Sequence, residues 1–159
     1  PMVHQALEQL LRDTNWPGGD FMIIDLPPGT GDAQFSLSQL CELTGAIIVS
    51  TPQDVALIDA VKAAQMFSKV EIDILGIVEN MSFFTCPKCG EETPIFSRNG
   101  AEEACQKLEA PFLGAIPIEL QVRKGGDEGK PLMASNLDSP ATTAFNNIAD
   151  NLVKVLEGE

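Results

Sequence analysis

Short apolar runs alternate with segments of helical periodicity along this chain, and no other feature restricts its fold as strongly. The runs cover residues 21–24, 46–50, 74–78 and 111–116. None of them alternates apolar with polar side chains, so each predicts a strand of a parallel sheet whose two faces are both covered. The sequence therefore predicts an α/β fold of one domain, in which helices flank a parallel sheet.

Two of the predicted helices have clear starting signals. Thr51 is followed by Pro52 and then by an acid at Asp54, which predicts a helix with Thr51 as its N-cap. Ser139 and Pro140 predict the start of the last helix in the same way. Both segments continue with apolar residues at helical spacing, so each helix is expected to bury one side against the sheet.

The stretch 82–99 differs from the rest of the chain. It contains Pro, Gly, a pair of Cys and two neighbouring Phe residues, and it has neither the period of a helix nor that of a strand. We expect it to leave the third predicted strand as a small excursion and to lead into a helix near 101–108. A further helix is predicted at 3–13.

The charge of the chain limits its partners. Ten Lys and Arg residues stand against 23 Asp and Glu residues, for a formal net charge of -13. Such a surface repels nucleic acid and anionic lipid, so neither is an expected partner. No apolar stretch approaches the roughly 20 residues of a membrane helix. Four Cys among 159 residues are too few for a disulfide scaffold, and the predicted location is the cytoplasm, where thiols stay reduced.

The run at 25–32, Asp-Leu-Pro-Pro-Gly-Thr-Gly-Asp, follows a predicted buried strand. An acid at the carboxyl end of a parallel strand lies where open α/β sheets bind ligands, and Asp25 is suited to hold Mg²⁺ there through water. Gly29 has no side chain, so its N–H can approach a phosphate oxygen closely. The alternative interpretation is a tight turn between a strand and a helix, since Pro-Pro-Gly is common in turns.

Cys86 and Cys89 form a Cys-x-x-Cys pair followed by glycine, the tight turn of zinc ribbons and iron–sulfur sites. A tetrahedral zinc or a cubane cluster needs four ligands, and this pair supplies two. Cys41 and Cys105 are interpreted as core residues, and His4 as a surface or packing residue. Two chains that each contribute the pair would complete the site across a two-fold axis. A surface disulfide and an empty turn are the alternatives.

Taken together, these segments resemble the Mrp/ApbC family of iron–sulfur carrier ATPases, which is part of the MinD/ParA group of P-loop proteins. The matching stretches lie at 25–32, 44–60, 76–90 and 113–132. The similarity runs from the first residue to about residue 133, and the final helix is also in its usual place. The resemblance implies a Rossmann-like P-loop NTPase fold, here a partial one that carries a small Cys-x-x-Cys hairpin.

The resemblance also implies roles for single residues. Asp25 corresponds to the Mg²⁺-linked acid of the switch II region, and Gly29 to the glycine whose N–H senses the γ-phosphate. Asn80 corresponds to the residue that recognises the adenine edge, and Pro117 to one that packs on the adenine ring. ATP and Mg²⁺ are the implied cofactors of the intact protein.

For the cysteine pair, the resemblance implies a [4Fe–4S] cluster that bridges two subunits through Cys86 and Cys89. The expected partners are then a second copy of the chain and the apo-proteins that receive the cluster. Because Asn80 lies only a few residues before Cys86, the nucleotide state is expected to reach the cluster-bearing hairpin along a short path.

One departure from the family is substantial, because nothing in this sequence fits the P-loop pattern G-x-x-x-x-G-K-[ST]. The chain is therefore interpreted as the carboxyl-terminal part, residues 1–159, of one ATPase domain. P-loop amides and the P-loop lysine supply most of the charge that holds a triphosphate, so weak ATP binding and negligible hydrolysis are expected of this chain. The missing strand should also leave an open sheet edge that favours self-association.

Two other functions remain as alternatives. A MinD/ParA-like spatial-organisation ATPase without a cluster would be expected to attach to membrane or DNA, yet residues 155–159 are acidic and form no basic amphipathic tail. A structural zinc site that joins two chains would use the same cysteine pair without any transfer of iron and sulfur.

Overall fold

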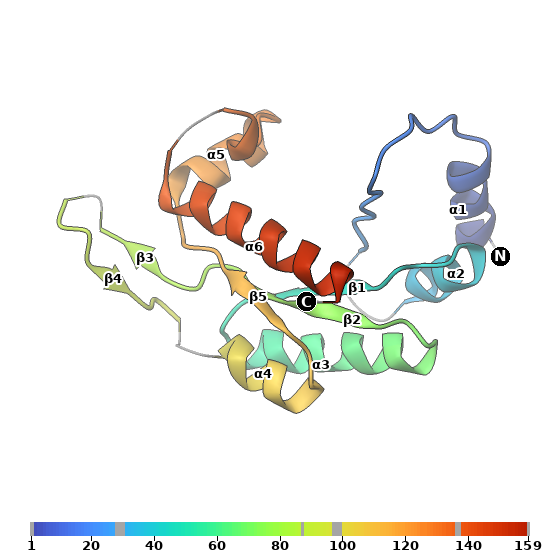
Figure 1. The fold of residues 1–159 in the computed structure, drawn as a ribbon, viewed down its shortest axis with the longest axis horizontal. Coiled ribbons are helices and arrows are strands. Elements are labelled where there is room, and N and C mark those ends of the chain that lie inside the picture. Colours follow the sequence, from blue (N-terminus) through green and yellow to red (C-terminus); the bar gives the residue numbers. More distant parts are fainter. Residues whose placement is uncertain (1, 28–30, 87, 97–99, 136–137, 159) are drawn as a thin grey trace.

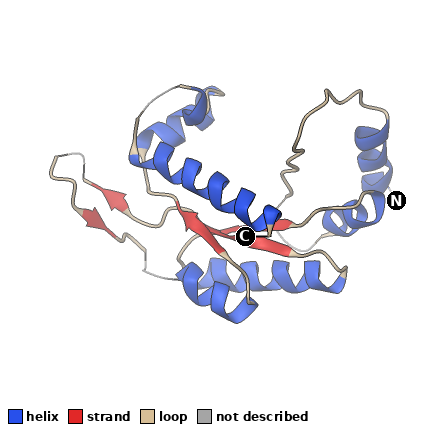
Figure 2. Ribbon diagram, in the orientation of Figure 1, coloured by secondary structure: helices blue, strands red, loops and turns tan. Residues whose placement is uncertain are grey.

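A parallel sheet of three strands forms the centre of the molecule in the computed structural model, which describes residues 2–27, 31–86, 88–96, 100–135 and 138–158. The strands are β1 (Ala46–Ser50), β2 (Ile74–Glu79) and β5 (Phe112–Ala115), in the order β1-β2-β5. They confirm three of the four predicted strands. Two short strands, β3 (Phe84–Thr85) and β4 (Glu92–Thr93), pair antiparallel in a hairpin beside the sheet (Figure 1, Figure 2).

Helices cover both faces of the sheet at β2 and β5, as their apolar runs predict, but only one face of β1, where Ile47 and Val49 are exposed and the prediction of two covered faces is wrong. Helices α3 (Asp54–Lys69) and α4 (Gly100–Leu108) lie on one face, and α6 (Pro140–Glu157) lies on the other (Figure 1). The core on the α3 and α4 side includes Ile48, Phe67, Ile77, Ala101 and Ala104. On the opposite face, Phe145, Ile148, Leu152 and Val155 of α6 pack against Val78, Leu113 and Ile116.

The predicted strand at 21–24 is wrong. These residues belong to a segment without regular structure, and Phe21, Met22 and Ile23 are exposed by 66%, 54% and 86%. A strand is stable only when its N–H and C=O groups pair with a neighbouring strand, and none of the described residues supplies that neighbour. High strand propensity alone is therefore not enough to form a strand at 21–24, and the segment stays irregular and exposed.

The segment joins two helices that lie apart from the sheet. Helices α1 (Met2–Arg12) and α2 (Asp32–Leu40) contact each other and stand together at one end of the molecule (Figure 1). The prediction of a helix at 3–13 is confirmed by α1, although no residue of this helix is buried. Met2, Val3 and Leu10 are exposed, and Leu7 and Leu11 are only half-buried.

The two predicted helix starts have different outcomes. Ser139 is the N-cap of α6, where its hydroxyl accepts a hydrogen bond from the Thr142 N–H at 3.2 Å, so this prediction is confirmed. The prediction for Thr51 is wrong, because α3 has Gln53 as its N-cap and begins at Asp54. Pro52 is fully buried in the loop before α3, and this burial delays the helix beyond the residue that the sequence favours.

The remaining elements follow β5. Helix α5 (Leu120–Glu128) contains Gly125 and Gly126, and Gly129 ends it in the left-handed conformation with a φ of 65°. A short 3-10 helix, η1 (Leu132–Ala134), contacts α5 and α6. These glycines therefore belong to a helix and its cap. None of the helices among the described residues is both long and apolar enough to cross a membrane.

In the described part of the chain, β1 and β5 are the two edge strands of the sheet, and each pairs only with β2. The edge at β1 is the one beside which the missing strand was expected. Val49 and Ile47 of β1 are exposed by 62% and 37%. An unpaired strand presents free N–H and C=O groups, so the self-association expected from the sequence stays a prediction with this edge as its candidate surface.

Candidate cluster and nucleotide site

The cysteine excursion leaves the sheet at the end of β2 and runs beside the segment that follows β5. The Ser82 N–H donates to Ile116 O at 3.0 Å, and the Ile118 N–H donates to Phe83 O at 2.6 Å. A further parallel bridge joins Phe84 to Ile118. The excursion therefore begins as a continuation of the β2–β5 pairing before it turns into the hairpin β3–β4, which lies beside the sheet (Figure 1).

Hydrogen bonds of the Cys86 backbone close the turn of this hairpin. The Cys86 N–H donates to Glu91 O, and the Gly90 N–H donates to Cys86 O, both at 2.9 Å. Hydrogen bonds from the backbone N–H groups of Lys88 and then Cys89 lower the pKa of the Cys86 thiol below its ordinary value. Because these bonds favour the thiolate, which is the form that binds metal, the turn has the chemistry predicted for a metal ligand pair.

The pair stands alone as a set of ligands. No group of three or more His, Cys, Asp or Glu side chains with metal-binding geometry occurs among the described residues. Cys86 is half-buried and Cys89 is exposed, and both thiols are free. The hairpin can therefore present two thiolates to a metal or cluster, and the other ligands have to come from outside this part of the chain.

Cys105 is a core residue, as the sequence predicts, whereas Cys41 is only partly buried. Cys105 is 8% exposed in the core between α4 and the sheet. Its pKa is raised, chiefly by burial and further by the charges of Glu102 and Glu79. Cys41 is half-buried at the end of α2, where its thiol donates to Leu37 O at 3.5 Å, and burial also raises its pKa.

Asn80 and Pro117 come together at the carboxyl ends of two neighbouring strands. Asn80 follows β2 directly, and its N–H donates to Ser50 O of β1 at 2.7 Å. The Ile116 N–H donates to Glu79 O at 2.8 Å, which brings the residues before Asn80 and Pro117 into one ladder. Pro117 is buried. The Asn80 side chain is half-buried, and its Oδ1 accepts the Met81 N–H at 2.9 Å.

Asp25 is not at the end of a strand, because the strand predicted before it does not form. Its side chain is exposed in the irregular segment 13–27, and Gly29 lies outside the described residues. The neighbours of Asp25 are nevertheless anchored. Leu26 packs against the main core, and Gln34 Nε2 of α2 donates to Pro27 O at 2.8 Å. The structure brings Asn80 and Pro117 together and leaves the role of Asp25 as a prediction.

Sequence reasoning missed Glu79, a buried acid at the last position of β2. Its side chain is 4% exposed, and both of its oxygens accept hydrogen bonds, one from Ser82 Oγ and one from the Ala101 N–H. The available signal was an acid that closes an otherwise apolar run, Ile-Leu-Gly-Ile-Val-Glu. A charged residue in such a place has to find partners that replace water.

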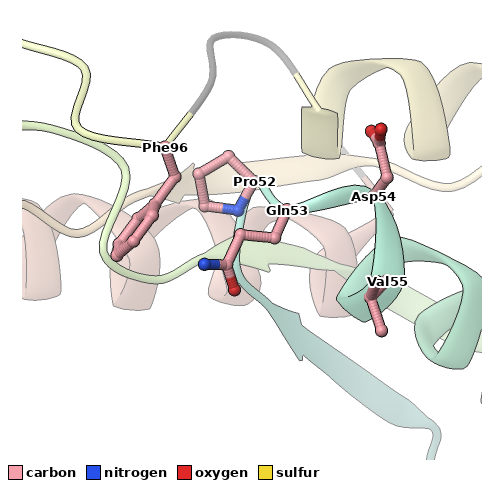
Figure 3. A pocket seen from close by; sticks show the side chains of 5 residues that line it. All are labelled: Pro52, Gln53, Asp54, Val55 and Phe96. Carbon is pink, nitrogen blue, oxygen red and sulfur yellow. The ribbon is translucent and has the colours of Figure 1, made fainter.

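A shallow pocket of about 540 Å³ lies close to the hairpin, between the loop before α3 and the segment after β4. Figure 3 shows its lining, in which Phe96 faces Pro52 and Gln53 while Asp54 and Val55 begin helix α3. None of the residues predicted to bind nucleotide or metal lines this pocket. It is a hollow between two surface segments and does not contain the site derived above.

The parallel sheet, the helices on both faces and the cysteine hairpin define a P-loop NTPase-like α/β protein. The chain belongs to the ParA-type family described as NUBPL iron-transfer P-loop NTPase, whose model matches residues 1–153. The family suggested by the sequence is thus confirmed.

Several relatives match nearly the whole chain. It is 52% identical over 157 residues to the iron-sulfur cluster transfer protein NUBPL of Dictyostelium discoideum, covering 99% of this chain and 49% of that protein. It is 47% identical over 157 residues to the iron-sulfur protein required for NADH dehydrogenase, mitochondrial, of Arabidopsis thaliana, covering 99% and 50%. It is 45% identical over 156 residues to the iron-sulfur cluster carrier protein of Escherichia coli K12, covering 98% and 42%.

A solved structure has the same fold. The nucleotide-binding protein of Archaeoglobus fulgidus in complex with ADP superposes with a TM-score of 0.76 at 36% identity, over 91% of this chain and 58% of that chain. The present chain spans about half the length of the curated relatives that it matches.

Proposed function

We propose that this chain is the cluster-binding part of an iron–sulfur cluster carrier. The observation that supports it most strongly is the pair of free thiols at Cys86 and Cys89 in the hairpin of β3 and β4, where backbone hydrogen bonds from Lys88 and Cys89 lower the pKa of the Cys86 thiol. Amide N–H groups directed at sulfur stabilise thiolate ligands and the negative charge of a cluster. An exposed Cys89 gives the cargo a route to another protein, as a carrier requires.

The cargo proposed is a [4Fe–4S] cluster held between two copies of the chain. Each copy contributes Cys86 and Cys89, and the two pairs together supply the four thiolates that a cubane needs. The named functions of the relatives, cluster transfer and cluster carriage, support delivery to apo iron–sulfur proteins as the purpose of the site. A two-fold site is also easy to open, because each chain holds only half of the ligands.

The nucleotide roles are proposed for the intact protein. Asn80 and Pro117 lie at the carboxyl ends of the neighbouring strands β2 and β5. The solved relative with ADP supports a nucleotide site in this fold. Asn80 is proposed to recognise adenine, Pro117 to pack on its ring, and Asp25 and Gly29 to act at the Mg²⁺ and the γ-phosphate. Hydrolysis supplies free energy for changing the conformation that holds the cluster. Without a P-loop, the present chain is proposed to bind ATP weakly and to hydrolyse it negligibly.

The compartment also stays a proposal. Free thiols in the hairpin suit a reducing environment, which agrees with the predicted cytoplasmic location. One relative is named as mitochondrial, and the mitochondrion is the competing compartment. Fractionation of cells that carry the complete protein, with antibody detection in each fraction, distinguishes the two.

Anaerobic reconstitution with ferrous iron and sulfide tests the proposed function. The parent chain should gain broad visible absorbance, about two irons and two sulfides per chain, and the sedimentation coefficient of a dimer. Cys86→Ser and Cys89→Ser should each abolish the absorbance, whereas Cys41→Ser, which alters a thiol outside the hairpin, should not. Transfer is then measured as activation of an apo iron–sulfur enzyme. Absorbance that survives both hairpin variants would disprove the site.

The same experiment separates a carrier from a zinc-bridged dimer. A structural zinc site would take up about one zinc per two chains without sulfide, and iron and sulfide would not replace it. Metal analysis of the parent before and after reconstitution gives the answer. Zinc that stays bound and blocks cluster assembly would contradict the carrier function.

A further inference from the structure

One buried carboxyl group joins the two ends of the cysteine excursion. Glu79 Oε1 accepts a hydrogen bond from Ser82 Oγ, and Glu79 Oε2 accepts the Ala101 N–H at 2.9 Å. Ser82 lies where the chain leaves the sheet, and Ala101 lies in the first turn of α4, where the chain returns. The two oxygens of a single side chain thus close the base of the loop that carries Cys86 and Cys89.

Contacts that do not involve Glu79 also hold both ends of the excursion. At the outgoing end, Ser82 is held by its N–H bond to Ile116 O at 3.0 Å. At the returning end, Gly100 fits against Pro52 so closely that a Cβ atom would stand 2.9 Å from Pro52 O. Glu79 lies between these fixed points, and its 4% exposure keeps water from replacing either bond.

The hairpin beyond this base has little support of its own. Strands β3 and β4 pair over only Phe84 with Thr93 and Thr85 with Glu92, and both residues of β4 are exposed. Such a short, exposed pair of strands is marginally stable alone. The direction in which its tip points therefore depends on how firmly the base is held.

We propose that Glu79 is a positioning residue that fixes the direction of the Cys86–Cys89 turn by tying both ends of the excursion to the end of β2. The proposal rests on the proposed function, because a cluster shared by two chains needs both turns at a defined place. A carboxyl group suits the task, since it accepts the Ser82 hydroxyl and the helix N-terminal amide together, and a negative charge is favoured at that helix end.

The experiment measures the direction of the hairpin without any metal. Nitroxide labels are attached to Cys89 and to a cysteine introduced by Gln65→Cys on the exposed side of α3, with the other cysteines replaced by serine. Pulsed electron–electron double resonance then gives the distribution of distances between the labels. Glu79→Leu should widen this distribution at least two-fold, and Ser82→Ala, which removes one of the two bonds, should widen it less.

Two variants separate positioning from a general loss of stability. Glu79→Gln keeps an acceptor oxygen and a polar group for both partners, so it should retain the narrow distribution. Glu119→Leu removes the similar cap that Glu119 provides to the Ala141 N–H of α6, and it leaves the Ser82 and Ala101 bonds intact. It should destabilise the protein without widening the distribution. An equal effect of Glu119→Leu and Glu79→Leu would overturn the proposal.

Cluster binding is measured separately on unlabelled proteins. Reconstituted cluster per chain should fall several-fold in Glu79→Leu and stay near the parent level in Glu79→Gln. If Glu79→Leu leaves the distances between the labels unchanged, the proposal is wrong. If the parent itself takes up no cluster although the distances respond, the proposed function fails and the control of hairpin direction by Glu79 still stands.

Discussion

Glu119 accepts the backbone N–H of Ala141 at 3.1 Å, and this contact repeats between β5 and α6 what Glu79 does for Ala101 between β2 and α4. In both cases a glutamate at or shortly after the end of a strand caps a helix whose first turn lies 22 residues further along the chain. Each of the two helices then packs on the sheet, on opposite faces. Each glutamate therefore ties the first turn of a covering helix, α4 or α6, to the end of a strand or the segment after it.

Removal of the second of these caps should weaken the fold by a modest amount. Glu119→Ala leaves the Ala141 N–H without its acceptor, and we expect the free energy of unfolding in urea to fall by about 1 kcal/mol. Glu119→Gln keeps an acceptor oxygen and should recover most of that loss. Equal losses in the two variants would show that the charge, and not the hydrogen bond, stabilises this end of α6.

Gly100 should not tolerate a side chain. A Cβ atom at this position would lie 2.8 Å from Leu57 Cδ1 and 2.9 Å from Pro52 O, so Gly100→Ala should push α4 away from the loop before α3. We expect a loss of about 1–3 kcal/mol in urea unfolding. Gly126→Ala is the matched control, because its Cβ would meet nothing within 4 Å in the middle of α5. It should stabilise the protein by about 0.5–1 kcal/mol.

A cavity created in the core between α6 and the sheet should destabilise the protein strongly. Leu113 is 1% exposed and belongs to the core that α6 covers, so Leu113→Ala should lower the free energy of unfolding by about 2–5 kcal/mol. Leu120→Ala changes the same kind of side chain where it is 56% exposed and should cost less than about 0.5 kcal/mol. Similar losses at the two positions would contradict the assignment of this core.

The buried thiol of Cys105 predicts a loss of stability at alkaline pH. Burial raises the pKa of this thiol above 9.0, so the folded state favours the neutral form. Its stabilising contribution is complete below the ordinary pKa and is lost as the pH rises through the value in the folded state. Relative to Cys105→Ala, the parent should therefore lose unfolding free energy above about pH 9. Urea titrations across that range measure the difference, and parallel pH profiles would refute the prediction.

Local chemistry explains which parts of the molecule could be read from the sequence. The cap of α6 was predictable because Ser139 satisfies an amide only three residues away. The turn at Cys86 was predictable because its hydrogen bonds come from the next few residues. Three strands were predictable from their apolar runs, although only β2 and β5 lie between helices on both faces, and Ile47 and Val49 of β1 are exposed.

The failures arose where distant residues decide the outcome. Residues 21–24 have the composition of a strand, but a strand exists only with a neighbour, and composition does not report whether one is present. Thr51 is a residue type that N-caps favour. The burial of Pro52 beside Gly100 nevertheless moves the start of α3 to Asp54. Glu79 was missed for the same reason, because its partner Ala101 lies 22 residues away.

The base that Glu79 closes has a consequence for how such proteins can vary. When a loop is fastened only where it departs and where it rejoins, its interior can change in length and sequence without disturbing the strands beneath it. The cysteine hairpin should therefore tolerate changes in length and sequence while Glu79 keeps its bonds to Ser82 and Ala101. A different metal-binding turn could replace the Cys86–Cys89 turn while Glu79 still holds the two ends of the loop.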